Sequence, residues 1–283
     1  MRTGTALRCL LQVALACLCI SPAAAQEQKE LTLWIYPFLP ATELTGRFTP
    51  LADYLAAELK RPVHIRVQTS YQSHLDFVGQ DQADIAYMGP ASYVLLRMKY
   101  GDKPLLARQE EGGASLFHGV IVVRRDSPLT SLADLRGKSF AFSDPNSTMG
   151  NVVPRAMLAQ AGVPVSRLGR YDFLRSQPNV ALAVLGGYFD AGAMRDEFFT
   201  EYETQGLRVL ATSPAMPEHL FLARSTLPGP LIERLRKLLY AIGSSPRKKE
   251  ILTSIKNTVT GLVPAEPRDY DSLEKLVRSG DRE

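Results

Sequence analysis

The chain has 283 residues, 45% of them hydrophobic, which is long enough for one large domain or for two lobes. It carries 33 basic and 29 acidic residues, and the basic residues form no long run, so nucleic acid is excluded as an expected partner. After residue 25 no segment has 18 consecutive apolar residues, so we expect a soluble mature chain.

The first 25 residues have the pattern of a secretory signal peptide. Two arginines accompany an apolar stretch, Leu10–Ile20, that is too short to span a bilayer comfortably. Three small residues, Ala23–Ala25, then precede Gln26. We therefore predict cleavage after Ala25 and export to the periplasm, with an uncleaved N-terminal anchor as the alternative.

All three cysteines, Cys9, Cys17 and Cys19, lie within this segment. Cleavage would leave a mature chain without cysteine, which excludes a disulfide, a thiolate metal site and a cysteine nucleophile. A lipid anchor at Cys17 or Cys19 is a further alternative. The sequence before Cys17 argues against it, because Ala14 stands where a lipoprotein signal has a large aliphatic residue.

Strand-like and helix-like segments alternate through the rest of the chain, which is typical of an α/β protein with largely parallel sheets. Thr49 and Pro50 are expected to be the N-cap and the first residue of an early helix. Up to residue 110 we expect strands at 31–36, 63–68, 84–88 and 105–108, and helices at 51–60, 71–79 and 91–100. Beyond it we expect strands at 119–125, 139–142, 190–193, 209–210 and 220–223, and helices at 131–135, 147–161, 179–185, 231–242, 247–256 and 270–278.

The order of these elements predicts two lobes. A chain that leaves one sheet near residue 110 and returns near residue 212 forms two mainly parallel sheets, flanked by helices and joined by a two-stranded hinge. We expect the signal peptide at 1–25, the first part of lobe I at 26–112, lobe II at 113–212, and the return to lobe I with the C-terminal helices at 213–283. Ligands of such sheets bind at the carboxyl ends of the strands, which face the cleft in a two-lobed protein.

The segment 144–150, with the sequence DPNSTMG, is the strongest local signal for a binding site. It joins a strand to a helix, and the first turn of a helix has N–H groups without partners and a dipole that favours anions. The hydroxyls of Ser147 and Thr148 add donors, and Gly150 would let a ligand approach the backbone. The alternative is an ordinary helix start in which Ser147 or Thr148 is only the N-cap.

Four other side chains stand at predicted strand ends or at the hinge. Tyr36 and Tyr93 could point hydroxyls into the cleft, or could be core or rim aromatics. His118 precedes a hinge strand and is either a ligand contact or a structural histidine. Arg195 follows the strand at 190–193 and either meets a ligand or pairs with Asp196.

Sequence patterns of catalysis are absent. There is no Gly-x-Ser-x-Gly elbow, no His-Glu-x-x-His helix and no phosphate-binding loop that ends in Gly-Lys-Ser/Thr. The four histidines show no metal-ligand spacing. We therefore expect no metal, no cofactor and no catalysis, and a periplasmic enzyme is the weakest of the alternatives.

Several motifs in a fixed order resemble the phosphate/phosphite/phosphonate-binding proteins that supply ABC transporters. The resemblance covers residues 31–225. It includes FTPLADYL at 48–55, DIAYMGPASY at 84–93, DSP at 126–128, SLADLRGK at 131–138, FAFSDPNSTMG at 140–150, PR at 154–155 and DAGA at 190–193.

This resemblance implies a type II periplasmic-binding fold, with two lobes that close on a ligand, and it implies no catalysis. It implies that Ser147 and Thr148 hold a phosphorus oxyanion and that Tyr36 and Tyr93 are cleft aromatics. Two positions depart from the family pattern. Met149 stands where the family has a third hydroxyl, and Ser176-Gln177-Pro178 stands where it has Ser-His-Asp/Glu. The second departure argues against an aminoalkylphosphonate.

The leading hypothesis is a monomeric periplasmic protein that captures a small oxyanion, such as phosphate, phosphite or a phosphonate, or a small organic anion, and delivers it to an ABC permease. The alternative is a sensory subunit that presents its ligand to a membrane histidine kinase. In either case Ser147, Thr148 and nearby N–H groups would hold the anion. Tyr36, Tyr93, His118, Met149, Gln177 and Arg195 are the expected residues around it.

Overall fold

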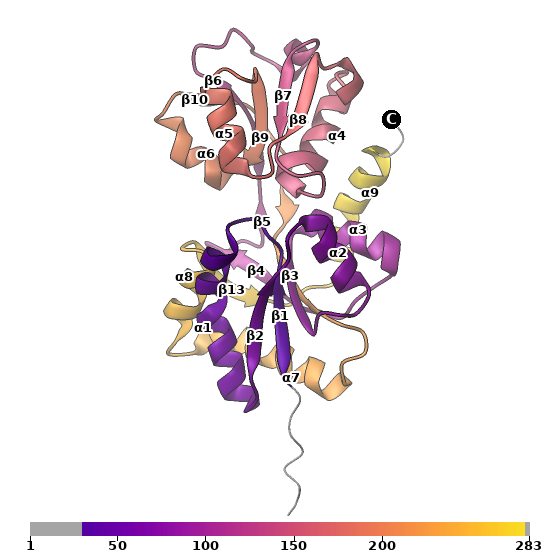
Figure 1. The fold of residues 1–283 in the computed structure, drawn as a ribbon, viewed down its shortest axis with the longest axis vertical. Coiled ribbons are helices and arrows are strands. Elements are labelled where there is room, and N and C mark those ends of the chain that lie inside the picture. Colours follow the sequence, from indigo (N-terminus) through magenta and orange to yellow (C-terminus); the bar gives the residue numbers. More distant parts are fainter. Residues whose placement is uncertain (1–29, 281–283) are drawn as a thin grey trace, which may run out of the picture.

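Three parallel strands form one side of the first sheet. Strand β1 (Leu31–Ile35) pairs in parallel with β2 (Val63–Val67) and with β3 (Ile85–Met88). Parallel neighbours need crossover connections, which helices α1 (Ala41–Leu59) and α2 (Tyr71–Gly79) provide. The computed structural model, which describes residues 30–280, places this sheet in the lower lobe of Figure 1, here called lobe I.

Antiparallel strands complete lobe I, one formed before the chain leaves for the second lobe and two after it returns. The strand order is β13-β4-β12-β3-β1-β2, in which β4, β12 and β13 pair antiparallel with their neighbours. The added elements are α3 (Pro90–Tyr100), β4 (Leu105–Glu111), β12 (Leu220–Ala223), α7 (Gly229–Ala241), α8 (Lys248–Ile255), β13 (Val259–Val263) and α9 (Asp271–Gly280).

Lobe II, the upper lobe of Figure 1, has a five-stranded sheet in the order β10-β6-β9-β7-β8. Strand β7 pairs in parallel with β8 and β9, whereas β6 pairs antiparallel with β9 and β10. Both sheets are therefore mixed, which corrects the expectation of mainly parallel sheets. The elements are β6 (Gly119–Arg124), β7 (Ser139–Phe142), α4 (Val153–Gln160), β8 (Arg170–Phe173), α5 (Gln177–Leu185), β9 (Ala191–Arg195), α6 (Asp196–Glu203) and β10 (Leu207–Thr212).

Two strands connect the lobes. Strand β5 (Leu116–Phe117) leads from lobe I to lobe II, β11 (Met216–Pro217) leads back, and the two pair antiparallel. This agrees with the predicted two-lobed α/β architecture and its two-stranded hinge. The predicted unit boundaries at residues 112 and 212 stay a prediction. The predicted signal peptide at 1–25 lies outside the described residues, and no described helix is long and apolar enough to cross a membrane.

Helix α1 begins at Ala41, nine residues before the expected first residue Pro50, so Thr49 and Pro50 lie inside it. Its buried positions include Leu44, Phe48, Leu51 and Leu55, which recur at helical spacing on both sides of the proline. This continuous apolar face packs on the sheet, and burial offsets the hydrogen bond that a proline removes from a helix interior. The assumption that Pro50 marks a first turn was therefore wrong.

Sequence patterns also missed three elements, β8, α6 and β13. Strand β8 lies at the edge of its sheet and is largely exposed, so it lacks an apolar pattern. The spacing of β13 is broken by a register shift at Gly261. Helix α6 has no buried residue, so it has no apolar stripe that a sequence pattern could detect.

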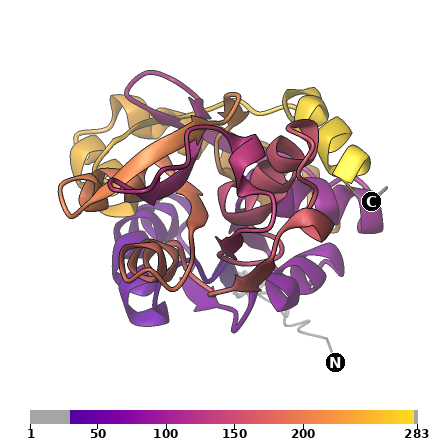
Figure 2. The ribbon, with the colours of Figure 1, turned by 90° about the horizontal axis from the view of Figure 1, so that it is seen from above.

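The C-terminal helix α9 touches both lobes. It packs against α3 of lobe I and against α4 of lobe II, and it lies along one flank of the molecule (Figures 1 and 2). Arg97 of α3 forms ion pairs with Asp271 and Glu274 of α9. Leu273 belongs to the same apolar cluster as Val153 of α4, so the lobes share a hydrophobic contact outside the hinge.

Candidate functional site

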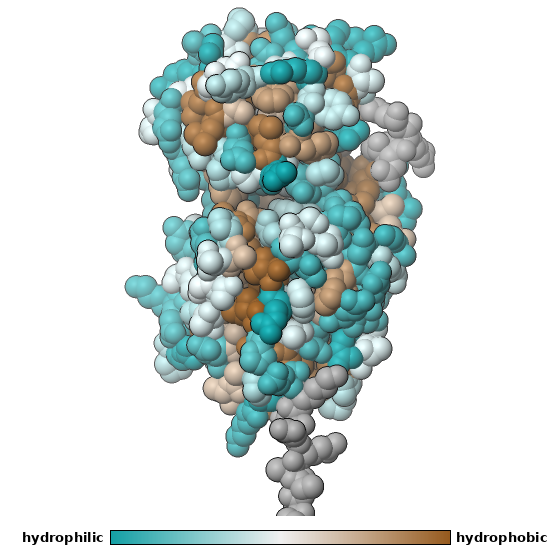
Figure 3. All heavy atoms as spheres, in the orientation of Figure 1, coloured by the Kyte–Doolittle hydropathy of each residue, from teal (hydrophilic) through white to brown (hydrophobic). Residues whose placement is uncertain are grey.

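A cleft of about 960 Å³, with the open solvent at its mouth included, lies between the lobes. It is at the level of the waist between the two masses in Figure 3. Its walls come largely from segments that follow the carboxyl ends of strands β1, β3, β7, β8 and β9, as expected for sheets of this kind. Six of the predicted residues line it: Tyr36, Ser147, Thr148, Met149, Gln177 and Arg195.

Tyr93 and His118 do not line the cleft. The Tyr93 side chain, on α3, is fully buried, and its ring makes an edge contact with the ring of Tyr270 at a centroid distance of 4.9 Å. The preceding residue of α3, Ser92, lines the cleft instead. His118 lies at the hinge, and its Nδ1 is 2.9 Å from the carbonyl oxygen of Ser213.

The predicted anion-binding turn starts a helix, but the first turn is π-helical, over Thr148–Val152, and α4 follows it. Ser147 is the N-cap, and its Oγ accepts a hydrogen bond from the Gly150 N–H at 3.1 Å. The Thr148 and Met149 N–H groups have no hydrogen-bond acceptor among residues 30–280. These two donors belong to the turn for which the sequence predicts anion binding.

The same turn caps a helix of the opposite lobe. Helix α3 has no side-chain cap of its own, and its Ala91 N–H donates to Oγ1 of Thr148 at 3.0 Å. Beside this contact, the Ser92 hydroxyl donates to the carbonyl oxygen of Asn146 at 3.1 Å. The structure therefore has the lobes in direct contact at the anion-binding turn, with Thr148 bonded to lobe I.

Met149, the first departure from the family pattern, packs at the hinge. Its side chain is 1% exposed, and Sδ lies 3.8 Å from the Ser213 hydroxyl. A Cβ on Gly119 would lie 2.7 Å from the same sulfur, so the methionine fills the space that this glycine leaves. A thioether packed against Gly119 of β6 and Ser213 therefore stands where the family has a third hydroxyl.

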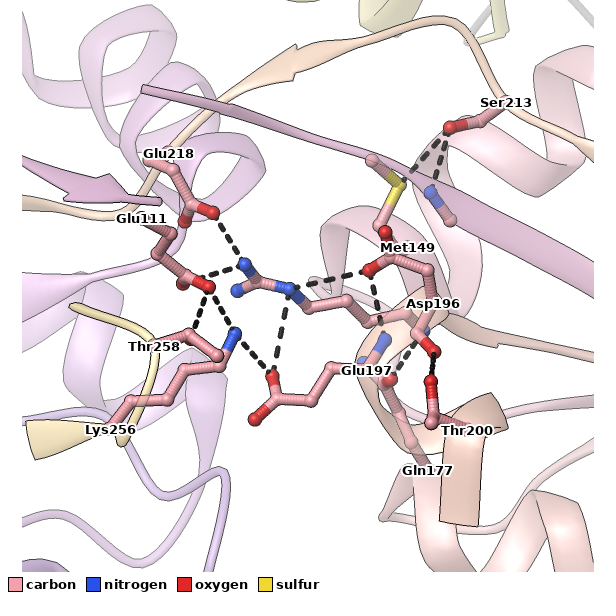
Figure 4. Close-up of polar contacts among 12 residues, drawn as sticks. Glu111, Met149, Gln177, Asp196, Glu197, Thr200, Ser213, Glu218, Lys256 and Thr258 are labelled. Carbon is pink, nitrogen blue, oxygen red and sulfur yellow. Dashed lines mark hydrogen bonds and ion pairs between the residues drawn. The ribbon is translucent and has the colours of Figure 1, made fainter. Parts of the chain in front are cut away.

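An ion-pair network around Arg195 crosses the cleft. Figure 4 labels its other members, which are Glu111, Glu197, Glu218 and Lys256. Arg195 comes from β9 of lobe II, its side chain is 8% exposed, and its Nη2 donates to Glu111 at 2.8 Å and to Glu218. Lys256 of lobe I joins Glu111 at 2.5 Å and Glu197 of α6 at 2.7 Å. Two acids of lobe I thus bind an arginine of lobe II, and an acid of lobe II binds a lysine of lobe I.

The network keeps the Glu111 carboxyl ionised. Burial alone would raise the pKa of the Glu111 carboxyl, but the cations of Arg195 and Lys256 lower it to about 2. The guanidinium of Arg195 is neutralised by Glu111 and Glu218. It also lies over the aromatic ring of Phe117, with its Cζ 4.2 Å from the ring centroid. The ion pair with Asp196, which was the alternative to a ligand contact, is the longest of the ion pairs of Arg195, at 3.9 Å. A ligand contact of Arg195 stays a prediction.

Arg175 is a cleft cation that the sequence analysis did not find. It follows β8, has a left-handed backbone with φ of 71°, and forms no ion pair within the described part of the chain. Such a conformation is uncommon for a residue other than glycine. A sequence signal was present, because Arg175 directly precedes Ser176, the N-cap of α5.

Gln177, the second departure from the family pattern, is held in a fixed orientation. Its Oε1 accepts a hydrogen bond from the Arg195 backbone N–H at 2.6 Å. The Nε2 group has no hydrogen-bond partner among the described residues, and the side chain lines the cleft. An amide donor that does not titrate therefore stands where the family has a histidine.

Aromatic rings form the lobe I wall. Tyr36 stacks on Phe38 and on His219, with centroid distances of 4.7 and 5.6 Å. Burial raises the pKa values of the Tyr36 and Tyr71 hydroxyls, so both remain protonated donors at neutral pH. Among residues 30–280 no group of three or more metal-ligand side chains could hold a metal ion.

His74 lies behind this wall and predicts a pH dependence of stability. It is 1% exposed, both ring nitrogens lack hydrogen-bond partners, and burial lowers its pKa from 6.5 to about 3. The unfolded state therefore binds the proton more tightly. The contribution of His74 to the free energy of unfolding is constant above about pH 6.5. As the pH drops below this value the free energy of unfolding decreases, by about 2–3 kcal/mol at about pH 4.5.

We expect the His74→Phe variant to lose this part of the acid destabilisation, measured by urea unfolding across the same pH range. The exposed His64 provides the control, and His64→Phe should retain the wild-type slope. Equal slopes for His74→Phe and the wild type would contradict the assignment.

Comparisons with known proteins agree with this fold. The model of a family described as "ABC transporter, phosphonate, periplasmic substrate-binding protein" matches residues 33–270. The phosphate-import protein PhnD of Mycolicibacterium smegmatis is 24% identical, over 97% of this chain and 94% of its own. The phosphonates-binding periplasmic protein of Escherichia coli is 25% identical, over 82% of this chain and 72% of its own.

The structure of PhnD1 from Prochlorococcus marinus in complex with methylphosphonate superposes with a TM-score of 0.79. It is 21% identical, with 90% of this chain and 99% of that chain covered. This likeness confirms the two-lobed fold, and the family match confirms a binding protein and not an enzyme. The chain belongs to the family of periplasmic substrate-binding proteins of phosphonate ABC transporters.

Proposed function

We propose that the protein captures a small phosphorus oxyanion in the interlobe cleft, in the periplasm after signal-peptide cleavage, and delivers it to an ABC permease. The observation that carries the proposal is the set of donors that have no partner among residues 30–280. The Thr148 and Met149 N–H groups, Nε2 of Gln177 and the Arg175 guanidinium all belong to lobe II, at the ends of its strands.

The charges of the cleft support a small anion over a large or polyanionic one. Arg195 and Lys256 are already neutralised by Glu111, Glu218 and Glu197. Arg175 is then the lining cation of lobe II that has no ion pair among the described residues. One free cation and several neutral donors suit a compact anion with one or two charges.

A ligand panel tests the proposal. Phosphate, phosphite, methylphosphonate, sulfate and methanesulfonate are compared by thermal shift and then by calorimetric titration. A ligand at about 100 times its dissociation constant should add about 2.7 kcal/mol to the free energy of unfolding. No response to any phosphorus oxyanion would contradict the proposed ligand class.

Arg175 gives the sharpest variant for this panel. We expect Arg175→Met to weaken binding of the responding oxyanion by about tenfold, because a charge-assisted contact is lost from a partly exposed site. The exposed Arg66 on β2, whose Nη1 bonds only the neighbouring Ile65 carbonyl, is the matched control. Arg66→Met should bind like the wild type. An unchanged affinity for Arg175→Met would remove this residue from the site.

A further inference from the structure

His219 lies in the cleft at the point where the chain returns to lobe I, between β11 and β12. Its side chain is 12% exposed. The ring is nearly parallel to two tyrosines, with an angle of 18° and a centroid distance of 5.6 Å to Tyr36, and 21° and 5.7 Å to Tyr87. Phe117 of the hinge packs against the ring at 5.6 Å. The plane of the imidazole is therefore fixed from three sides.

A buried carboxylate determines which nitrogen carries the proton. Nδ1 lies 3.0 Å from Oε2 of Glu218, whose side chain is completely buried. A carboxylate only accepts hydrogen bonds, so Nδ1 carries a hydrogen and, in the neutral ring, Nε2 has a lone pair. The other oxygen of Glu218 accepts from Arg195, whose Nη1 is 3.5 Å from Nδ1.

The Nε2 atom points to the anion-binding turn. It has no hydrogen-bond partner among residues 30–280. It is also not completely buried, so it is open to the cleft. A Cβ on Gly89 would lie 3.6 Å from Nε2 and 3.7 Å from Oγ1 of Thr148. The imidazole of lobe I and the helix start of lobe II therefore approach the same small volume.

Resting on the proposed function and deepening it, we propose that His219 is a proton-dependent ligand contact that makes capture of the oxyanion tighter as the pH falls. The neutral ring turns a lone pair toward the anion, which disfavours an oxygen that carries no proton. The protonated ring donates from Nε2 to that oxygen, while Nδ1 stays bound to Glu218.

The charged neighbours of the ring act in opposite directions. Glu218 favours the imidazolium, and Arg195 of β9 disfavours it. The other titratable groups that face the ring are the phenols of Tyr36 and Tyr87, and burial raises both pKa values, so they stay neutral. A bound oxyanion adds a negative charge beside Nε2, so ligand and proton should bind cooperatively.

The test uses the full mature chain and methylphosphonate as the probe. Dissociation constants are measured by calorimetry at about pH 5.5 and about pH 8 for the wild type, for His219→Gln and for the control His64→Gln, which changes an exposed histidine of β2. The charge of the ligand changes equally in all three experiments. The ratio of variant to wild-type affinity therefore isolates the histidine.

We expect this ratio to change by about tenfold between the two pH values for His219→Gln and to stay constant for His64→Gln. If the wild type binds and His219→Gln shows the same pH dependence of binding, this inference is overturned and the proposed function stays intact. Absence of wild-type binding at both pH values would instead contradict the proposed function.

A measurement on the wild type avoids any dependence on the folding of a variant. The ring protons of His219 are followed by NMR through a pH titration, with and without saturating methylphosphonate. Linkage requires the midpoint to move to higher pH when ligand is bound, if the ligand prefers the protonated ring. A midpoint that does not move would overturn the inference.

Discussion

Replacement of Arg195 by methionine should lower the free energy of unfolding by about 3–5 kcal/mol, because it leaves buried acids without their cation. Glu218 is fully buried and would lose its guanidinium partner. Glu111 would keep Lys256, so the larger part of the loss should come from Glu218. Urea unfolding, monitored by circular dichroism, measures the change.

Two further variants separate loss of charge from loss of packing. Addition of Glu218→Gln to Arg195→Met removes the uncompensated charge and should restore part of the stability. Arg247→Met, which breaks an exposed pair with Glu250, should change stability little. A loss for Arg195→Met no larger than for Arg247→Met would contradict the role of the network.

The same network links the lobes, so Arg195→Met should also open the clamp. Arg195 joins β9 of lobe II to Glu111 and Glu218 of lobe I, and these contacts exist only when the lobes are together. A conformational equilibrium shifts by the difference in interaction energy between its states. We therefore expect a larger radius of gyration in small-angle scattering for the variant without ligand, and a smaller difference when ligand is saturating.

The sequence was sufficient for the parts of the site that depend on local chain order. Ser147 and Thr148 follow a buried strand and start a helix, and a local pattern of this kind specifies both the turn and its orphan N–H groups. Arg195 was likewise found from its place after a predicted strand, whereas Gln177 was found only through the family resemblance. Each of these residues lines the cleft, and their contact with a ligand stays a prediction.

The rest depends on how elements are rotated and packed. Successive residues of α3 point in different directions, and the sequence does not fix the rotation of that helix relative to the cleft. Ser92 therefore reaches the cleft, and Tyr93 is buried against Tyr270. His219 is a lone histidine in sequence, and its place between Tyr36 and Tyr87 exists only after the chain returns through the hinge. Glu218 needs the opposite lobe to supply its arginine.

Gly150→Ala should weaken oxyanion binding by about 100-fold, which corresponds to about 2.7 kcal/mol. The sequence suggested that this glycine lets a ligand approach the backbone. In the structure another group occupies the space, because a Cβ on Gly150 would lie 1.7 Å from Oγ of Ser143 and 2.8 Å from Oγ of Ser147. The methyl group would displace the N-cap and, with it, the turn whose Thr148 and Met149 N–H groups have no acceptor in the described part of the chain.

Overpacking of this turn should also lower the free energy of unfolding, by about 1–3 kcal/mol. Gly46→Ala is the control, because a Cβ there meets nothing within 4 Å. It lies inside α1, where alanine should raise stability by about 0.5–1 kcal/mol and leave binding unchanged.

A compensating change makes the physical cause testable. Ser143→Gly removes both Ser143 atoms nearest to the new methyl group, so the Ser143→Gly/Gly150→Ala double variant should regain much of the affinity lost in Gly150→Ala. Such recovery requires an interaction energy between the two sites, which a double-mutant cycle measures. Additive losses would mean that Gly150 matters through contact with the ligand and not through the space that Ser143 fills.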